Sequence, residues 1–367
     1  MTEVRHPLMA VPAGRTPTKK VVIVDDSSLV RKWLRIVLSK NPQLFVAGEA
    51  GTAHEARRVI KSIQPDVVML DIEMPGMSGL EFLDKLMRLY PVPVVMFSGM
   101  TEGDSDATVR ALMLGAVDCL QKPRTGNDIK SQDMIAKRVY AAACSRVHKR
   151  AALQTIAPQP VVTRQSNREP LVMIGASTGG VAALETVIAG LDPHGPPVII
   201  VQHMPGPYLI SFCKLLDHKF QQDIQLAQDG LVLRAGQIVL APAAGQHTEI
   251  MRKNGVWSCR SRDRSDKDLH CPSVHRLFQS GLSDASDIIA VMLTGLGRDG
   301  ADAMKALHDA GAIGLGQDAQ SSTVYGMPRA AWALGAVSKQ LSLADMATAI
   351  NQAAVEHRLN SAISQGL

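Results

Sequence analysis

Ser177 stands at the crest of a segment whose pattern suits a nucleophile. It lies in Gly175-Ala-Ser177-Thr-Gly179-Gly, after the apolar run 171–174 and before a helical pattern over 182–189. A strand that turns sharply into a helix exposes a hydroxyl and leaves backbone N–H groups free beside it. A glycine-rich turn before a helix also suits phosphate binding. This segment alone therefore leaves both chemistries open.

Two residues farther along supply the partners that a serine nucleophile requires. His203 follows the apolar run 198–202, and Asp299 lies in a glycine-rich loop after a later apolar run. A serine hydroxyl becomes a good nucleophile when a neutral imidazole takes its proton and a carboxylate fixes the tautomer of that imidazole. Singly, His203 could be an ordinary strand-end histidine, and Asp299 could cap the next helix. Together the three residue types favour a Ser-His-Asp triad.

The order of these residues excludes one well-known fold. The pentapeptide Gly-x-Ser-x-Gly around Ser177 is typical of α/β-hydrolases, in which the acid precedes the histidine along the chain. Here His203 precedes Asp299. We therefore keep the chemistry and reject the ordinary α/β-hydrolase.

A second reactive set lies in the first half of the chain, where polar residues end four apolar runs. Three carboxylates that converge at one sheet edge repel one another unless a divalent cation neutralises them, and oxygen ligands suit Mg²⁺. A carboxylate beside Mg²⁺ and a lysine is placed to attack a phosphoryl group. Singly, the aspartates could cap a helix or begin a turn. The set comprises Asp25, Asp26, Asp71, Ser98 and Lys122.

The elements that position both sets alternate between strand and helix, which predicts two doubly wound parallel sheets. In such sheets the reactive groups gather at the carboxyl ends of the strands. The predicted strands are 19–24, 45–47, 66–70, 92–97 and 116–120 in the first half, and 171–174, 197–202, 236–241, 287–294 and 312–316 in the second. The predicted helices include 27–40, 52–63, 182–189, 208–219, 273–280 and 301–310.

A basic segment separates the two halves. Residues 137–168 carry seven Lys and Arg residues and no Asp or Glu. The pattern predicts a helix over 134–152 and a linker after it, since prolines interrupt the remainder. A solvated helix face is the favoured interpretation of the basic run over a binding patch.

Composition sets further limits. A chain of 367 residues suggests two domains, and its net charge of +5 permits an anionic partner without indicating nucleic acid. Five scattered cysteines without a C-x-x-C pair indicate reduced thiols rather than disulfides or a zinc site. Neither a signal sequence nor an apolar run of about 20 residues is visible. We expect a cytoplasmic protein without membrane insertion.

The acidic set carries a first resemblance. Val-Asp25-Asp26-Ser, Asp71-Ile-Glu-Met-Pro-Gly, Ser98 and Lys122-Pro resemble a response-regulator receiver domain of the flavodoxin-like fold, over residues 19–136. The resemblance implies that Asp71 is the phosphoacceptor, that Asp25 and Asp26 help to hold Mg²⁺, and that Ser98 and Lys122 bind the phosphoryl oxygens. Receivers usually carry a switch aromatic three residues before the lysine, whereas this chain has Cys119.

The second half resembles the catalytic domain of the chemotaxis protein-glutamate methylesterases (CheB-type), which is Rossmann-like, over residues 169–360. The resemblance implies that Ser177 is the nucleophile, His203 the base and Asp299 its orienter. It also implies an oxyanion hole built from the backbone N–H groups of Thr178 and Leu296. The runs that carry it are Gly-Ala-Ser177-Thr-Gly-Gly, Val-Gln-His203-Met, Leu240-Ala-Pro-Ala-Ala-Gly-Gln-His, Pro272-Ser-Val, Thr294-Gly-Leu-Gly-Arg-Asp299-Gly and Val324-Tyr-Gly-Met-Pro-Arg.

Three positions depart from that family's pattern. Methionine is more common at Leu296, where a backbone donor is little affected by the change. Cys271 and His275 stand where an arginine and an aspartate are common. The two substitutions remove a salt bridge that the family pattern would allow there.

The resemblance implies a phosphorylation-activated hydrolase that removes methyl groups from receptor glutamate methyl esters and deamidates receptor glutamines. Its partners would be methyl-accepting chemoreceptors and a histidine kinase, with Mg²⁺ in the receiver and no cofactor for the ester reaction. The unphosphorylated receiver would obstruct Ser177. We also hypothesise that the basic linker docks on acidic receptor helices. The alternatives are a signalling adaptor with a dead second domain and a DNA-binding regulator, for which no helix-turn-helix pattern appears.

Overall fold

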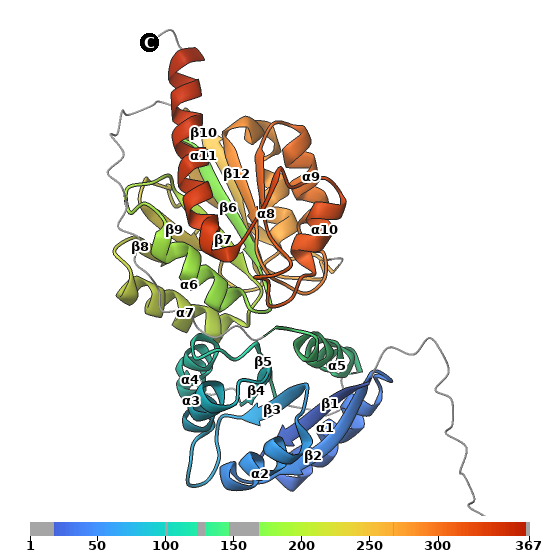
Figure 1. The fold of residues 1–367 in the computed structure, drawn as a ribbon. Helices are drawn as coiled ribbons and strands as arrows, with labels where there is room; N and C mark the ends of the chain where they lie inside the picture. Colours follow the sequence, from blue (N-terminus) through green and yellow to red (C-terminus); the bar gives the residue numbers. More distant parts are fainter. Residues whose placement is uncertain (1–17, 100–101, 123–128, 147–168, 267, 365–367) are drawn as a thin grey trace, which may run out of the picture.

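The computed structural model describes residues 18–99, 102–122, 129–146, 169–266 and 268–364. These residues form two α/β units, one above the other in Figure 1, each built on a parallel sheet. The strands are nearly continuous apolar runs because helices cover both faces of each sheet. This confirms the predicted fold class.

The lower unit holds a five-stranded sheet in the order β2-β1-β3-β4-β5, with every neighbouring pair parallel. This is the strand order of flavodoxin-like folds, in which ligands bind at the carboxyl ends near β1 and β3. The strands are β1 (Lys19–Val24), β2 (Leu44–Ala50), β3 (Val67–Asp71), β4 (Val94–Ser98) and β5 (Asp118–Gln121).

Local capping explains where the lower helices begin. The Ser27 and Ser78 hydroxyls cap α1 and α3, and at α2 the Thr52 hydroxyl accepts from Glu55 N while Glu55 accepts from the N–H of Gly51. α1 and α5 pack on one face of the sheet, and α2, α3 and α4 cover the other. The helices are α1 (Ser28–Ser39), α2 (Ala53–Ile63), α3 (Gly79–Leu89), α4 (Glu102–Met113) and α5 (Ile129–Ala143).

The upper unit holds a seven-stranded parallel sheet in the order β14-β13-β12-β6-β7-β9-β8. The chain starts in the centre at β6, runs to one edge, and returns through β12 to the other edge, so the order reverses beside β6. Ligand sites in open sheets lie at such a reversal. The strands are β6 (Leu171–Ala176), β7 (Val198–Gln202), β8 (Asp223–Leu226), β9 (Gln237–Leu240), β12 (Ile288–Met292), β13 (Ile313–Gln317) and β14 (Lys339–Leu341).

Helices again cover both faces of this sheet. The apolar cluster on one face includes α6 (Gly180–Gly190), α7 (Gly206–Lys219) and α11 (Leu343–Ser364), and that on the other includes α8 (Val274–Ser280), α9 (Ala301–Asp309) and α10 (Met327–Ala333). An antiparallel hairpin of β10 (Gln246–Lys253) and β11 (Val256–Asp263) packs against α8, and the 3₁₀ helix Leu282–Asp287 precedes β12. None of the helices in the described ranges is long and apolar enough to cross a membrane.

The helix predicted over 134–152 is wrong in its limits. α5 begins at Ile129 and ends at Ala143, and residues 147–168 lie outside the described part of the chain. The predicted end of the first domain, residue 136, falls inside α5. The expectation that the basic residues form a solvated helix face is also wrong for Arg138, because its guanidinium binds Asp118. The interpretation of the remaining linker stays a prediction.

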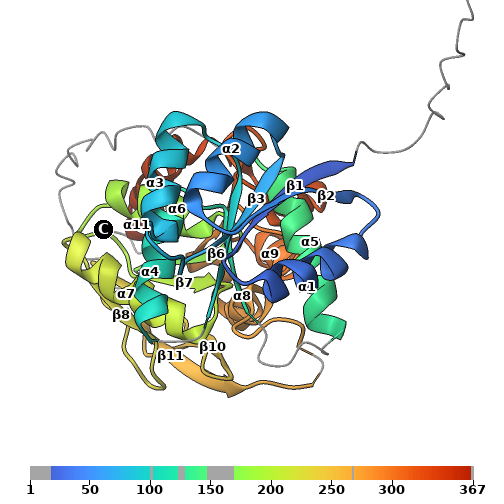
Figure 2. The same ribbon diagram turned by 90° about the horizontal axis from the view of Figure 1, so that it is seen from below.

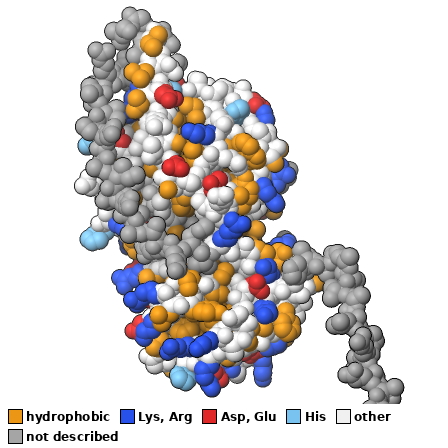
Figure 3. Space-filling model, in the orientation of Figure 1, with side chains coloured by type: hydrophobic (Ala, Val, Ile, Leu, Met, Phe, Trp, Pro, Cys, Tyr) orange, Lys and Arg blue, Asp and Glu red, His pale blue; other side chains and the backbone are white. Residues whose placement is uncertain are grey.

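The two units meet through α4 and β5 of the lower one and the N-terminal ends of α6 and α7 of the upper one. Figure 2 shows the lower unit from below, with α4 beside α7. On the face seen in Figure 3, Lys and Arg side chains spread around the lower unit rather than forming one stripe. The described residues of that face form no continuous basic track of the kind that follows a nucleic-acid backbone.

Candidate active site and its receiver

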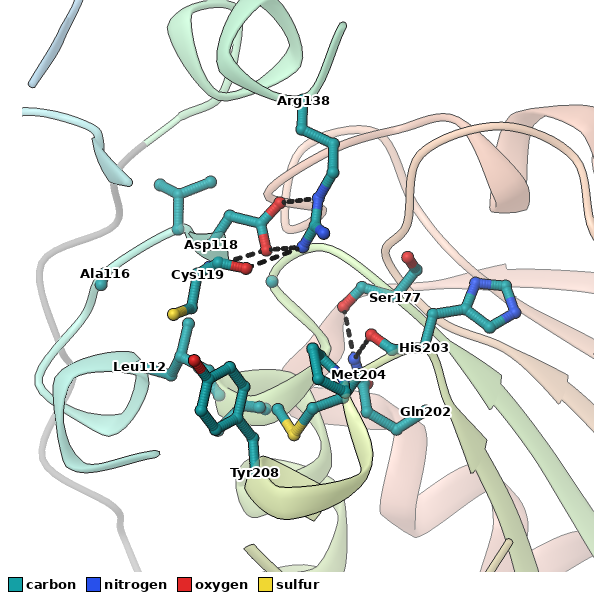
Figure 4. A pocket seen from close by; sticks show the side chains of 15 residues that line it. Leu112, Ala116, Asp118, Cys119, Arg138, Ser177, Gln202, His203, Met204 and Tyr208 are labelled. Carbon is teal, nitrogen blue, oxygen red and sulfur yellow. Dashed lines mark hydrogen bonds and ion pairs between the residues drawn. The ribbon is translucent and has the colours of Figure 1, made fainter. Parts of the chain in front are cut away.

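The structure brings the predicted triad together at the carboxyl ends of three adjacent strands. Ser177 follows β6, His203 follows β7, and Asp299 lies in the loop after β12. His203 Nε2 lies 2.9 Å from Asp299 Oδ2. The Nδ1 atom of His203 is buried without a hydrogen-bond partner in the described residues, and Ser177 and His203 line the same cavity (Figure 4).

Asp299 is fixed from a second direction by the start of α8. Its carboxylate accepts hydrogen bonds from Ser273 Oγ (3.0 Å) and from the N–H groups of Val274 (2.8 Å) and His275 (3.2 Å). The alternative that Asp299 caps α9 is wrong, because Gly300 is the N-cap there and gives no side-chain bond. The Asp299 carboxylate is thus held between the N-terminal end of α8 and the imidazole of His203.

These contacts also keep Asp299 ionised. Burial by itself would raise the pKa of this carboxyl group, but the hydrogen bond and charge of His203, with the N–H of Val274, lower it to about 2. An ionised carboxylate at His203 Nε2 favours a proton on that nitrogen. The lone pair on Nδ1 is then free to accept a proton.

The turn after Ser177 is shaped by backbone bonds. Ser177 N donates to Thr294 O at 3.0 Å, and Gly179, which has a φ of 79°, forms the N-cap of α6. The N–H groups of Thr178 and Leu296 donate to no acceptor in the described part of the chain. Two unpaired donors beside a hydroxyl are what an oxyanion hole needs.

Sequence reasoning missed a glutamine that ties the two strand ends together. The buried Gln202 donates from Nε2 to Ser177 O (2.9 Å) and to His203 O (3.1 Å). Gly180 is required beside it, because a Cβ there would lie 2.0 Å from Gln202 Oε1. The signal was Gln202 itself, a polar residue at the end of a wholly apolar strand.

A second missed residue lies against the histidine. The rings of His270 and His203 stack with centroids 4.4 Å apart and an interplanar angle of 11°. The pKa of His270 is lowered, first by loss of hydration and then by the charge of His203. Only its place next to Cys271-Pro272-Ser273 marked it in the sequence.

The five residues of the acidic set also meet at one sheet edge. Ligand oxygens of Asp25, Asp26 and Asp71 lie within 4.8 Å of one another, and Asp25 and Asp71 are buried. Lys122 Nζ lies 3.0 Å from Asp25 Oδ2 and 2.7 Å from Asp71 Oδ2. Ser98 ends the neighbouring strand β4.

This carboxylate set fits a divalent cation. Burial raises the pKa of Asp71 to about 6, a shift that Lys122 opposes and Asp25 reinforces. One ammonium group does not neutralise three clustered carboxylates, and a bound divalent cation would supply the missing positive charge. The donor set is all oxygen, as Mg²⁺ prefers.

The Ser98 hydroxyl also contacts a residue of the upper unit. This buried hydroxyl donates to Gly99 O (3.2 Å) and accepts from Thr108 Oγ1 (3.4 Å). The hydroxyl of Tyr208, from α7, lies 3.3 Å from Gly99 O and 3.5 Å from Ser98 Oγ. A tyrosine of the upper unit therefore reaches the lower unit beside Cys119, where receivers usually carry their own aromatic.

The lower unit covers the turn that carries Ser177. Thr178 Oγ1 donates to Asp118 Oδ2 at 3.2 Å, and Gly179 N donates to Val117 O at 3.1 Å. Arg138 binds the same carboxylate of Asp118 through Nε at 2.8 Å, as Figure 4 shows. The cavity left between the units beside Ser177 measures about 20 Å³, room for roughly one water molecule.

Comparisons with known proteins agree with both halves. The family model described as CheB methylesterase matches residues 172–350, and the model described as response regulator receiver domain matches residues 21–132. A protein-glutamate methylesterase/protein-glutamine glutaminase 1 of Caulobacter vibrioides is 42% identical over 337 residues, which cover 90% of this chain and 96% of that protein. The protein of the same activity name from Agrobacterium fabrum is 43% identical over 332 residues, covering 89% and 94%.

A solved structure is also similar to the upper unit. The crystal structure of the Thermotoga maritima CheB methylesterase catalytic domain is 26% identical in sequence, with a TM-score of 0.48. It covers 50% of this chain, and the match spans 98% of that domain.

Proposed function

Because this chain belongs to the family of CheB-type protein-glutamate methylesterases/protein-glutamine glutaminases, we propose that it hydrolyses glutamate methyl esters and deamidates glutamines of chemoreceptors under control of its receiver. The observation that carries the proposal is the pair His203–Asp299. Asp299 holds Nε2 at 2.9 Å, and the partnerless Nδ1 is left for Ser177.

In the first step Ser177 Oγ attacks the carbonyl carbon of the methyl ester, and His203 Nδ1 takes the hydroxyl proton. The negative charge on the carbonyl oxygen is held by the N–H groups of Thr178 and Leu296. The C–O bond to the methoxy group breaks, and His203 returns the proton so that methanol leaves. Water, deprotonated by the same imidazole, then releases the glutamate carboxylate from Ser177.

The same machinery deamidates glutamine. The amide nitrogen is a poorer leaving group than methoxide, so its protonation by His203 carries more of the barrier. Ammonia leaves where methanol left, and the acyl-enzyme is the same. No cofactor enters either reaction in this proposal.

The receiver supplies the control. We infer that a histidine kinase donates its phosphoryl group to Asp71, and that Asp25, Asp26 and Asp71 hold Mg²⁺ at that moment. The cation would neutralise charge on the phosphoryl oxygens. Lys122 and, after its hydroxyl turns, Ser98 bind those oxygens. With these proposed partners, we also propose a cytoplasmic location.

The closed contact between the units supports inhibition before phosphorylation. A cavity of about 20 Å³ cannot admit a methylated glutamate side chain next to Ser177. Asp118 and Val117 hold the two residues that follow the nucleophile. Phosphorylation at Asp71 would have to move β5 and α4 away for a receptor helix to reach the site.

One experiment tests the proposal. Methanol release from methylated receptors is measured for the wild type, Ser177→Ala and Asp71→Ala, each with and without a small phosphodonor. We expect no release from Ser177→Ala, and basal release without stimulation from Asp71→Ala. Full activity in Ser177→Ala would refute the proposal. Labelling of Ser177 by a serine-reactive phosphonate separates an esterase from an adaptor with a dead second domain.

A further inference from the structure

The stack of His270 on His203 has a role that the triad chemistry alone does not assign. Asp299 holds the His203 ring at one edge atom, Nε2, by a single hydrogen bond. A ring held at one atom can still rock about that bond, and rocking would swing Nδ1 away from Ser177. The parallel face of His270, with its centroid 4.4 Å away, limits that motion from the side.

His270 is an exposed side chain, but the chain segment that carries it is anchored. It lies in the segment Asp268–Ser273, which is anchored at both ends. At one end Asp268 accepts hydrogen bonds from Ser265 N (2.8 Å), Arg276 Nη2 (3.0 Å) and the buried His247 Nε2 (3.1 Å). The pKa of Asp268 is lowered well below its usual range by these donors, with the N–H of Ser265 first, so the anchor stays charged.

The other end is attached to the triad itself. Ser273 Oγ donates to Asp299 Oδ1 at 3.0 Å and accepts from Arg276 N as the N-cap of α8. The short segment between these anchors therefore lies in a fixed relation to both His203 and Asp299. A support of this kind keeps a reactive geometry that would otherwise be averaged over several ring orientations.

The charge of His270 is also suited to a support. The groups that act on it are His203 after β7, Asp299 before α9 and Arg138 of the receiver. Loss of hydration, the charge of His203 and the charge of Arg138 all favour the neutral form of His270, and Asp299 opposes them. A neutral ring does not repel the imidazolium that His203 becomes when it takes the proton of Ser177.

We propose that His270 is a positioning residue for the methylesterase reaction: its ring fixes the plane of the His203 imidazole from the face that Asp299 leaves open. The inference rests on the proposed function. It assigns His270 no proton transfer and no contact with the receptor.

The test compares His270→Ala with His270→Phe in the full-length, phosphodonor-stimulated protein. His270→Ala should lower kcat about tenfold with KM for the receptor unchanged, since a misplaced base costs rate rather than binding. His270→Phe keeps a ring in the stack and should restore kcat to within about twofold of the wild type. The fall of kcat at low pH should occur at the same pH in His270→Phe as in the wild type. Leu269→Ala, at a neighbouring side chain that is 89% exposed, is the matched control.

Two readouts make the result decisive. The rate of phosphonate labelling of Ser177 should fall in His270→Ala and recover in His270→Phe, independently of the receptor. Equal loss in both variants would overturn the proposal in favour of a hydrogen-bonding or proton-carrying role, and full kcat in His270→Ala would overturn it outright. A wild-type protein that released no methanol would instead refute the proposed function. Thermal unfolding of each variant checks that the fold is intact.

Discussion

Thr178, the residue after the proposed nucleophile, donates its hydroxyl hydrogen bond to Asp118 of the receiver across 3.2 Å. The side chain of Thr178 therefore serves the contact between the domains, while its backbone N–H donates to no acceptor in the described residues and is the donor that we propose for the oxyanion hole. In this proposal inhibition and catalysis use different atoms of one residue.

The variant Thr178→Val tests this division. It removes the hydroxyl and keeps the shape and the backbone N–H, so one buried hydrogen bond of the closed state is lost. A hydrogen bond of this kind stabilises the closed state by about 1 kcal/mol net, so its loss should raise the activity of the unphosphorylated protein about fivefold. Methanol release without phosphodonor measures it, and the stimulated rate should stay within about twofold.

Thr186→Val is the control for that variant. Thr186 is on the same helix, α6, and its hydroxyl donates only to Ala182 O, one turn back. Its activity should match the wild type with and without phosphodonor. A rise equal to that of Thr178→Val would show that the contact with Asp118 does not restrain the enzyme.

Tyr208→Phe should weaken the communication between the phosphorylation site and the active site. The hydroxyl of Tyr208 reaches Gly99 O and Ser98 Oγ of the receiver, and the ring is buried in the interface. Losing the hydroxyl should raise basal activity about threefold and lower the stimulation ratio by the same factor. Tyr140→Phe, which removes a hydroxyl that accepts from Gln43 within the receiver, should change neither quantity.

Asp299→Asn should nearly abolish catalysis without unfolding the protein. An amide retains the shape but cannot hold His203 in the tautomer with its proton on Nε2, and it presents a donor to Val274 N and His275 N. Loss of the corresponding carboxylate in serine proteases lowers kcat about 10⁴-fold. Single-turnover methanol release measures the loss, and a fall of less than about tenfold would contradict the assigned role.

The low pKa of Asp299 predicts an acid-labile contribution to stability. Its folded pKa, about 2, lies below the ordinary value of 3.8, so the ionised form is favoured by folding. Asp299 thereby adds about 2 kcal/mol to the free energy of unfolding. This contribution is complete above about pH 4 and is lost as the pH falls towards 2. Unfolding of the wild type should lose stability more steeply than Asp299→Asn between pH 4 and pH 2. Parallel curves would rule the coupling out.

Removal of divalent cations should separate the two domains functionally. With EDTA, the carboxylates of Asp25, Asp26 and Asp71 lack their counter-charge, so phosphodonor stimulation should disappear. Basal methanol release should stay constant, because the proposed ester chemistry uses no metal. Restoration by excess Mg²⁺ completes the test, and loss of basal activity under EDTA would contradict it.

The sequence allowed the strand ends to be predicted because buried parallel strands are short apolar runs, and the polar residue that ends each run is conspicuous. Ser177, His203, Asp25 and Asp71 all lie at such ends. The hairpin β10–β11 was not predicted, because its strands carry charged residues such as Glu249 and Arg260, which pair across it. Strands β8 and β14 were missed because they are short strands at the two edges of the sheet and mix polar with apolar residues, so they form no apolar run.

Contacts between distant segments could not be predicted. Thr178 and Asp118 are 60 residues apart, and Tyr208 and Ser98 are 110 apart, so no local pattern couples them. The stack of His270 depends on the tertiary anchoring of Asp268. Sequence pattern identified which residue types react, whereas the fold determines which neighbours restrain them.

The orientation of His203 has a mechanical consequence. The nitrogen that Asp299 leaves for the base is Nδ1, which is nearer to the main chain than Nε2, so the distance from the backbone to the base is short. Only a few residues separate His203 from Tyr208, which is attached to the receiver. If the receiver moves Tyr208, we therefore expect the base to move with it, so that the receiver would act on the position of His203 as well as on access to Ser177.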